Sequence, residues 1–335
     1  MLKLLVTGGA GFIGSNFIQY TLREHPDWEV VNLDKLTYAG NLENLRDVEN
    51  NPQYRFVKGD IADREKVDEV LREGFDVIVN FAAESHVDRS ILDPSPFIET
   101  NVRGTQMLLE GVRQYKVRKF IQVSTDEVYG SIEEGKFTED SALHPNSPYA
   151  ASKAAADLLC HAYWRTYNSP VLITRCTNNY GPFQFPEKLV PLVITNALEG
   201  KEIPIYGDGL NIRDWIYVED HCHALDSVIQ RGKPGERYNI GAANEKTNLE
   251  LVKFILDIME KPQSLIKFVA DRPAHDRRYA LDTSKIEREL GWKPGISFKE
   301  GVSRTVQWYI QNESWWRQIK SGEYAEYYQR MYLRR

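Results

Sequence analysis

A glycine-rich segment near the N-terminus restricts the possible folds more than any other feature of this sequence. It reads Gly8-Gly9-Ala10-Gly11-Phe12-Ile13-Gly14, follows an apolar run over residues 2–7 and precedes a helical pattern over residues 15–23. Glycines at such a turn permit positive φ angles and let backbone N–H groups approach phosphate oxygens at the positive end of the helix. The segment therefore predicts a strand, a phosphate-binding turn and a helix, the first unit of a dinucleotide-binding fold.

An acidic residue after the second strand supports this prediction and favours one dinucleotide. Asp34 lies 20 residues beyond Gly14, just past a strand pattern over residues 29–33. A carboxylate there accepts hydrogen bonds from the adenosine ribose hydroxyls, and it repels the 2′-phosphate of NADP. The sequence therefore favours NAD, although the neighbouring Lys35 weakens the discrimination slightly. Weaker candidates for cofactor contacts follow the third and fourth strands: Asp60, Ile61, Phe81, Ala82 and Ala83.

Strand patterns alternate with helical patterns through the first half of the chain. The expected strands cover residues 2–7, 29–33, 54–57, 77–81, 120–124 and 171–175. Such alternation predicts an α/β, Rossmann-like fold, in which helices cover both faces of a doubly wound parallel sheet and ligands bind at the carboxyl ends of the strands. We expect a cofactor-binding domain over 1–180 and a smaller mixed α/β substrate domain over 181–335, with some later segments returning to the first domain.

Composition excludes several classes of function. The 335 residues include 42 Lys and Arg against 48 Asp and Glu, a net charge of −6 that repels nucleic acid. The N-terminal apolar run is too short for a signal peptide, and no stretch approaches the roughly 20 apolar residues that span a bilayer. The three cysteines have neither zinc-ribbon spacing nor an even count, which indicates reduced thiols. We expect a cytoplasmic protein with no nucleic-acid or membrane partner.

A tyrosine and a lysine four residues apart predict a proton-transfer pair. Ser147 and Pro148 are typical of a helix start, so Tyr149 and Lys153 fall on one face of a helix that runs toward residue 167. A free tyrosine has a pKa of about 10, but a nearby lysine and a positive nicotinamide ring favour its phenolate. We expect Tyr149 to take a proton from a hydroxyl and Lys153 to hold the nicotinamide ribose.

These motifs carry a family resemblance over essentially the whole chain. With the glycine turn, the Tyr149–Lys153 pair and the hydroxyls of Ser124 and Thr125, the sequence resembles the extended short-chain dehydrogenases/reductases, and more narrowly the dTDP-glucose 4,6-dehydratases. The narrower resemblance rests on the segments AESHVDRS (83–90), STDEVYG (124–130), RCTNNYGP (175–182) and DRP (271–273). Epimerases and decarboxylases of the family generally lack the adjacent acidic residues that follow Thr125. Ala274 departs from the pattern, which usually has glycine.

The resemblance implies a dehydration that passes through a 4-ketone. Tyr149 takes the proton from the sugar O4 while NAD takes the C4 hydride, and Thr125 hydrogen-bonds the oxygen that becomes a carbonyl. The ketone acidifies C5–H, so that an ionised Glu127 removes this proton while a protonated Asp126 donates one to O6, and water leaves. NADH then returns its hydride to C6. Adjacent residues of a strand point to opposite faces. The chain therefore has to turn at Asp126 and Glu127 for both carboxyl groups to reach one pocket.

The resemblance also implies ligand contacts and an oligomeric state. The expected NAD contacts are Gly8, Gly11, Phe12, Ile13, Gly14, Asp34, Lys35, Leu36, Thr37, Asp60, Ile61, Phe81, Ala82, Ala83, Thr100, Tyr149, Lys153 and Asn179. The expected contacts to the nucleotide sugar are Glu84, Ser85, Thr125, Asn178, Lys188, Leu189, Pro204, Tyr206, Arg213, Asn248, Arg272 and His275. The resemblance further implies a homodimer built from the helices around residues 97–115 and 148–167.

Alternatives remain open from the sequence. A nucleotide-sugar 4-epimerase or another nucleotide-sugar dehydratase uses the same Tyr149 and Lys153, and an NAD-sensing scaffold needs the cofactor site alone. His221 and His223 have no third ligand nearby, so we expect no metal site, and we expect His86 to hydrogen-bond within its loop. The tail is rich in aromatic residues, which we expect to pack rather than to recognise a partner: Trp308, Tyr309, Trp315, Trp316, Tyr324, Tyr327 and Tyr328.

Overall fold

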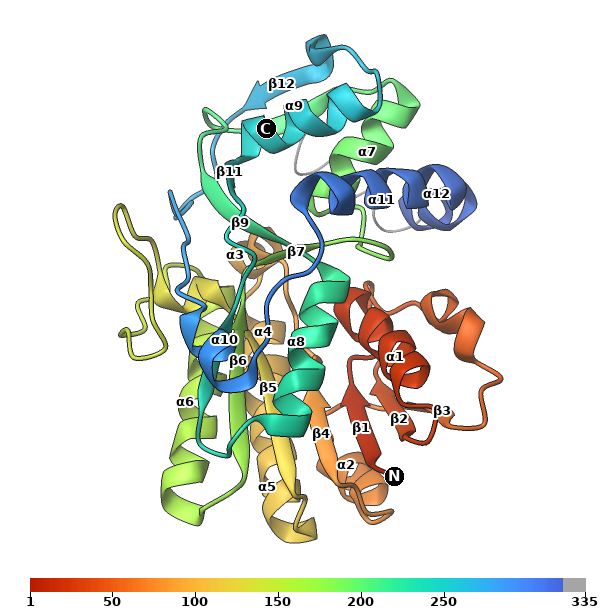
Figure 1. Ribbon diagram of the computed structural model, residues 1–335, viewed down its shortest axis with the longest axis vertical. Coiled ribbons are helices and arrows are strands. Elements are labelled where there is room, and N and C mark those ends of the chain that lie inside the picture. Colours follow the sequence, from red (N-terminus) through yellow and green to blue (C-terminus); the bar gives the residue numbers. More distant parts are fainter. Residues whose placement is uncertain (322–335) are drawn as a thin grey trace.

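The computed structural model describes residues 1–321, and a seven-stranded parallel sheet forms its centre (Figure 1). The strands lie in the order β10, β6, β5, β4, β1, β2, β3, and every neighbouring pair is parallel. Their bounds are Lys3–Thr7 (β1), Glu29–Asp34 (β2), Tyr54–Lys58 (β3), Val77–Asn80 (β4), Lys119–Thr125 (β5), Val171–Cys176 (β6) and Arg237–Ile240 (β10). The predicted doubly wound sheet is confirmed, and its strand order reverses between β1 and β4, where ligands bind in such folds.

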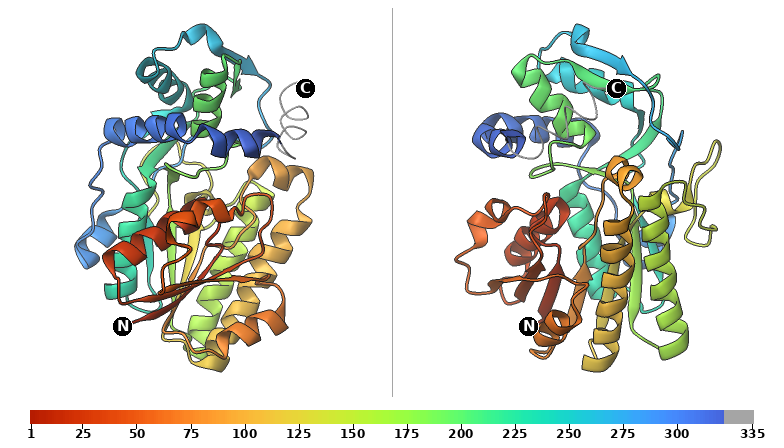
Figure 2. Two further views of the ribbon diagram at one scale, coloured as in Figure 1. Left: turned by 90° about the vertical axis from the view of Figure 1, so that its right-hand side faces the viewer. Right: turned by 180° about the vertical axis from the view of Figure 1, so that it is seen from behind.

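Helices cover both faces of this sheet (Figures 1 and 2). One layer consists of α1 (Phe12–Glu24), α8 (Val218–Arg231) and α10 (Ser284–Leu290), and the other of α2 (Arg64–Leu71), α5 (Thr105–Tyr115) and α6 (Pro148–Tyr167). Along β1, Leu4 and Val6 are buried under the first layer, whereas Leu5 is buried under the second. Successive strand side chains point to opposite faces, so a strand covered on both sides is an unbroken apolar run.

A smaller unit lies above the carboxyl edge of the sheet and has its own core. Its strands form two sheets, β11-β9-β7 and β12-β8. Its elements are β7 (Asn178–Tyr180), α7 (Leu189–Glu199), β8 (Ile203–Tyr206), β9 (Ile212–Tyr217), β11 (Glu245–Thr247), α9 (Asn248–Ile258), η4 (Gln263–Leu265), β12 (Ile266–Val269), α11 (Phe298–Gln311) and α12 (Glu313–Ser321). Tyr309 and Trp316 are buried in this core and Trp308 and Trp315 pack against it, as expected; the three tail tyrosines lie outside the described residues.

Short helical segments connect the strands around the carboxyl edge. They are η1 (Leu42–Val48), α3 (Val87–Leu92), α4 (Ser95–Phe97), η2 (Ile98–Gly104) and η3 (Asp126–Tyr129). Segments from beyond residue 181 also lie with the large sheet, because β10 pairs with β6 and α8 packs against α1. The division at residues 180 and 181 stays a prediction. No helix within residues 1–321 is long and apolar enough to cross a membrane.

The three cysteines are all unpaired and buried, at Cys160, Cys176 and Cys222. Each lies in a sheet or helix core, where burial raises the pKa of the thiol. The three thiols are free in the structure, and their reduced state in the cell stays a prediction from their spacing and odd number.

Candidate active site

A cleft opens at the carboxyl ends of the strands and extends to the loop before α7. It is lined by all the expected NAD contacts except Leu36, and by five of the expected sugar-nucleotide contacts: Glu84, Ser85, Thr125, Asn178 and Lys188. The glycine turn lies at one end and the catalytic candidates at the other. The structure thus brings the glycine turn and the catalytic candidates into one continuous site.

The glycine turn is tight because two of its positions accept no side chain. Gly8 has a φ of +69°, and a Cβ there would lie 2.6 Å from the backbone nitrogen of Ala82. A Cβ on Gly14 would lie 2.4 Å from the carbonyl oxygen of Gly8. The turn leads into α1, whose first N–H groups have no partner within the helix and are suited to a phosphate. This cradle fits the pyrophosphate of a dinucleotide.

Asp34 holds this turn in place while lining the cleft. Its Oδ2 accepts a hydrogen bond from the Ala10 N–H at 2.9 Å, and its Oδ1 accepts one from the Leu36 N–H at 2.8 Å. Each carboxylate oxygen retains a lone pair for a ribose hydroxyl. Lys35 Nζ lies 2.6 Å from Asp60 Oδ2, so the lysine charge is paired away from Asp34. That pairing reduces the weight of the Lys35 charge against a preference for NAD. Leu36 supports Asp34 through its backbone and does not line the cleft.

The chain turns at the end of β5, as the chemistry requires. The strand ends at Thr125 and the 3₁₀-helix η3 begins at Asp126. Thr125 caps this helix, its Oγ1 accepting a hydrogen bond from the Glu127 N–H at 3.3 Å. Asp126 and Glu127 consequently both line the cleft instead of pointing to opposite faces of a strand.

The two carboxyl groups have different environments. Asp126 is only 2% exposed, and its burial together with the neighbouring Glu127 charge raises its pKa to about 8. Its Oδ1 accepts a hydrogen bond from Thr125 Oγ1 at 3.2 Å. Within residues 1–321 its Oδ2 is buried without a hydrogen-bond partner. Asp126 is therefore suited to be a neutral acid near pH 7.

Glu127 lies opposite a group of cations. Burial raises its pKa, and Arg272, Arg213 and Lys188 act against that shift by favouring the carboxylate. All three cations belong to the expected contacts of the sugar nucleotide, so the electrostatics place them near Glu127. This arrangement suits a base that is ionised beside an anionic ligand.

Tyr149 and Lys153 lie at the start of α6, where the sequence predicts them. Ser147 caps the helix by accepting from the Ala150 N–H at 3.1 Å. The Thr125 side chain hydrogen-bonds the Tyr149 hydroxyl, and Lys153 Nζ donates to the Val123 carbonyl at 2.7 Å. Burial raises the pKa of Tyr149 well above its ordinary value, and the Glu127 charge adds to this. The protein alone therefore disfavours the expected phenolate of Tyr149. Of the two positive groups expected to favour it, the nicotinamide ring would have to provide the stabilisation.

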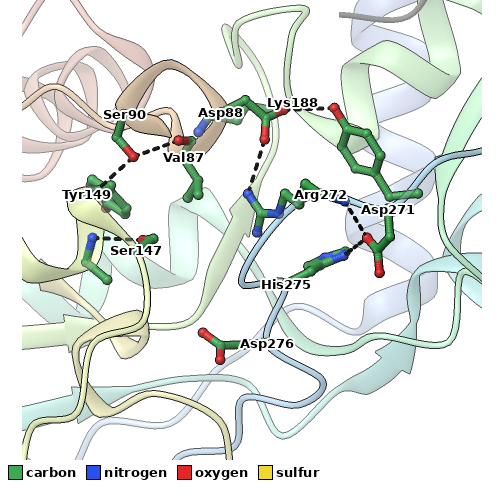
Figure 3. Close-up of polar contacts among 12 residues, drawn as sticks. Val87, Asp88, Ser90, Ser147, Tyr149, Lys188, Asp271, Arg272, His275 and Asp276 are labelled. Atoms are coloured by element: carbon green, nitrogen blue, oxygen red, sulfur yellow. Dashed lines mark hydrogen bonds and ion pairs between the residues drawn. The ribbon is translucent and has the colours of Figure 1, made fainter. Parts of the chain in front are cut away.

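The other expected sugar-nucleotide contacts come from the smaller unit. Arg213 is buried, donates to the carbonyl groups of Ile212 and Asp276 at 2.7 and 2.9 Å, and lies over the Tyr279 ring. Arg272 and His275 lie on one loop (Figure 3), and Arg272 is close enough to Lys188 for its charge to lower the pKa of that lysine. Leu189 and Asn248 begin α7 and α9, and Pro204 and Tyr206 lie on β8. These four, like the two arginines and His275, do not line the described cleft.

Several lining residues escaped the sequence reasoning. Two of them, Gly40 and Gly59, are glycines in the loops after strands, a signal that could have identified them. The others lie in or next to an irregular loop that has no periodic pattern: Cys176, Thr177, Gln184, Phe185 and Glu187. Glu187 is buried and paired with Arg89 of α3, its Oε2 lying 3.0 Å from Arg89 Nε. His86 does form a hydrogen bond, but its ring bonds the backbone of Glu187, in the loop before α7, and not a partner within its own loop as expected.

Comparisons with known proteins give the same picture. A family model described as GDP-mannose 4,6 dehydratase matches residues 5–305. A dTDP-glucose 4,6-dehydratase of Streptomyces niveus is 50% identical over 328 residues, 97% of each chain. The crystal structure of a dTDP-glucose 4,6-dehydratase of Streptomyces venezuelae with NAD bound is similar at a TM-score of 0.93 and 54% identity, covering 95% of this chain and 100% of that one. A UDP-glucuronic acid 4-epimerase of Bacillus cereus has a TM-score of 0.87 at 30% identity, over 92% of this chain and 99% of that one.

Proposed function

This chain belongs to the GDP-mannose 4,6 dehydratase family, with dTDP-glucose 4,6-dehydratases among its relatives, and from that premise we propose that it is a hydro-lyase that converts dTDP-glucose to dTDP-4-keto-6-deoxyglucose. The observation that carries the proposal is the pair Asp126 and Glu127 in one cleft beside Tyr149. A 4-epimerase only oxidises and reduces C4, so it has no use for a second acid and base. Removal of a C5 proton and of the O6 hydroxyl needs both.

NAD, which the solved relatives carry, would supply here an acceptor for the hydride of C4 and, in its reduced form, a hydride donor for C6. The glycine turn and the first N–H groups of α1 hold its pyrophosphate, and Asp34 holds its adenosine ribose. Lys153 orients the nicotinamide ribose. Ala82 and Ala83 leave room along the strand ends.

The residues of the chain perform the proton transfers. Tyr149 accepts the proton of the O4 hydroxyl, and Thr125, which already bonds the Tyr149 hydroxyl, holds the same oxygen as it becomes a carbonyl. Glu127 takes the proton from C5, and the same carboxyl group returns a proton to C5 when C6 receives its hydrogen. Asp126, whose pKa of about 8 keeps it protonated at neutral pH, donates to O6 so that water leaves.

A substrate panel with isotopic labelling tests the proposal. dTDP-, UDP-, GDP- and CDP-glucose are each offered to the enzyme, and the product is identified. We expect a 4-keto-6-deoxy sugar from dTDP-glucose, with deuterium placed at C4 recovered at C6. A C4 epimer would instead indicate the epimerase, and bound cofactor without turnover of any sugar nucleotide would indicate the scaffold. The Tyr149→Phe variant should lose about 10²- to 10⁴-fold in the rate of C4 oxidation.

We also propose a cytoplasmic homodimer, in line with the family resemblance and the reduced thiols. Ile98 and Leu158 are 54% and 60% exposed, and they lie on the two helical regions expected at the interface, η2 and α6. Burying such side chains against a second copy removes apolar surface from water. Light scattering should give the mass of a dimer for the wild type and of a monomer for Leu158→Glu. A monomeric wild type would contradict this assembly.

A further inference from the structure

Helix α3 connects the smaller unit to the start of the catalytic helix (Figure 3). Asp88 of α3 is only 4% exposed, and its Oδ2 accepts a hydrogen bond from the Tyr206 hydroxyl at 2.9 Å. Its Oδ1 lies 3.6 Å from Arg272 Nη1. Two residues further along the same helix, Ser90 Oγ accepts from the Tyr149 N–H at 3.2 Å. One buried carboxylate therefore contacts two side chains that are expected to bind the sugar nucleotide.

One N–H donor of Arg272 is unused among the described residues. The side chain is 14% exposed, and its Nε is buried without a hydrogen-bond partner within residues 1–321. Oδ1 of Asp88 likewise has no hydrogen-bond partner in this part of the chain. Close charge-assisted hydrogen bonds measure about 2.7–2.9 Å, so the contact at 3.6 Å is a loose ion pair. A buried guanidinium with an unused N–H group fits a further anionic ligand.

The surrounding charges favour a ligand with two negative groups. Lys188 and Arg213 act with Arg272 on the pKa of Glu127, so three cations converge on this region. Lys188 Nζ is held by the Ser85 carbonyl at 2.9 Å. Among carboxylates, Glu127 and Asp88 have the largest effects on the pKa of Arg272 and raise it. Glu127 is the base of the proposed reaction. Asp88 is therefore the carboxylate that can stay paired with Arg272 while a ligand binds.

We propose that Asp88 is a positioning residue that holds Arg272 and Tyr206 in the orientation that binds the diphosphate of the sugar nucleotide. The inference rests on the proposed function, which supplies that diphosphate. The carboxylate fixes one edge of the guanidinium and the tyrosine hydroxyl, so the remaining N–H groups of Arg272 stay directed toward a phosphate, which a planar guanidinium binds through two parallel hydrogen bonds.

Calorimetric titration with dTDP tests this role without requiring turnover. Asp88→Asn keeps an acceptor for Tyr206 but removes the charge beside Arg272. It should weaken dTDP binding on the order of 10-fold, because Arg272 loses the carboxylate that holds it in the binding orientation. The KM for dTDP-glucose should rise in the same proportion while kcat stays within about 3-fold of the wild type. A merely structural defect would instead lower kcat and thermal stability together.

Three further measurements complete the test. Asp93→Asn makes the same charge change at the exposed end of α3 and should leave dTDP binding unchanged. In the Arg272→Lys background, Asp88→Asn should weaken binding much less than in the wild type, because the two residues act on one contact. If Asp88→Asn does not fold, Tyr206→Phe replaces it, with an expected loss of a few-fold in dTDP affinity.

The failures of the two proposals are distinguishable. Wild-type affinity in Asp88→Asn, or in Tyr206→Phe where that variant replaces it, would overturn the role of Asp88 and leave the proposed function intact. Strictly additive effects of Asp88→Asn and Arg272→Lys would also overturn it. A wild-type enzyme that binds no dTDP would overturn the proposed function, and with it the role assigned to Asp88.

Discussion

Asp126 and Glu127 are consecutive residues whose carboxyl groups enter the same cleft, because β5 ends one residue before them and the chain turns into η3. Their proximity also separates their roles. The Glu127 charge is the second cause, after burial, that raises the pKa of Asp126, whereas three cations favour the charged form of Glu127. One residue is thereby suited to donate a proton and its neighbour to accept one.

Glu127→Gln should separate C4 oxidation from proton removal at C5. The variant keeps the shape of the side chain but has no base, so exchange of the C5 hydrogen with deuterated solvent should fall at least about 10²-fold. Reduction of the bound cofactor on mixing with substrate should persist. Mass spectrometry of the recovered sugar measures the first quantity, and absorbance measures the second. Glu134→Gln makes the same change at an exposed position and serves as the control. Undiminished exchange at C5 would remove Glu127 from its assigned role.

The water-loss step should depend on pH through Asp126. This residue acts as an acid, and with a pKa of about 8 its protonated fraction falls as pH rises through that value. We expect the elimination rate of the wild type to be level below about pH 7 and to decline above pH 8. Asp126→Asn should be slower by about 10²-fold or more and should lose this decline. Asp140→Asn, at a side chain that is 92% exposed, should keep the wild-type profile. A decline that persists in Asp126→Asn would assign the titration to another group.

A buried ion pair beneath the catalytic turn should contribute strongly to stability. The side chains of Asp157 and Arg175 are 1% and 3% exposed, and Arg175 Nε lies 2.9 Å from Asp157 Oδ2. Arg175 also donates a hydrogen bond to the Tyr129 hydroxyl at the end of η3. Asp157→Asn leaves a buried cation without its counter-charge and should lower the free energy of unfolding by about 3–5 kcal/mol.

The matching double variant tests the reason for that loss. Asp157→Leu combined with Arg175→Met removes both charges, so it should be less destabilised than Asp157→Asn alone. Denaturant unfolding measures both variants. A double variant that is less stable than the single one would show that the pair stabilises the fold by more than mutual neutralisation.

Ala274 should carry a measurable conformational strain. Its φ is +52°, which costs an L-residue with a Cβ about 1–2 kcal/mol, whereas glycine adopts this region freely. Part of the gain is offset by the larger entropy of glycine in the unfolded chain, so Ala274→Gly should raise stability by about 0.5–1 kcal/mol. Ala142 is also exposed but has no positive φ, so Ala142→Gly should have the opposite sign or no effect. Melting temperatures compare the two variants, and equal shifts would contradict the strain.

Local sequence patterns predicted six of the seven strands of the large sheet, β1 to β6, and many of the residues that line the cleft. The strands are short apolar runs because their side chains point to two faces of the sheet that helices cover. Ser147 and Pro148 predict the start of α6, and the helix begins at Pro148. The glycine turn, Asp34 and the Tyr149–Lys153 pair are likewise short-range signals.

Only the tertiary structure decided what depends on burial and on contacts between distant segments. Asp88 meets Arg272 across 184 positions of the chain, and no periodicity encodes that meeting. The pKa values of Asp126 and Tyr149 rise because packing removes water around them, which composition and spacing do not express. Sequence patterns record the preferences of neighbouring residues, whereas desolvation and the electric field at a site arise from all the chain that packs around it.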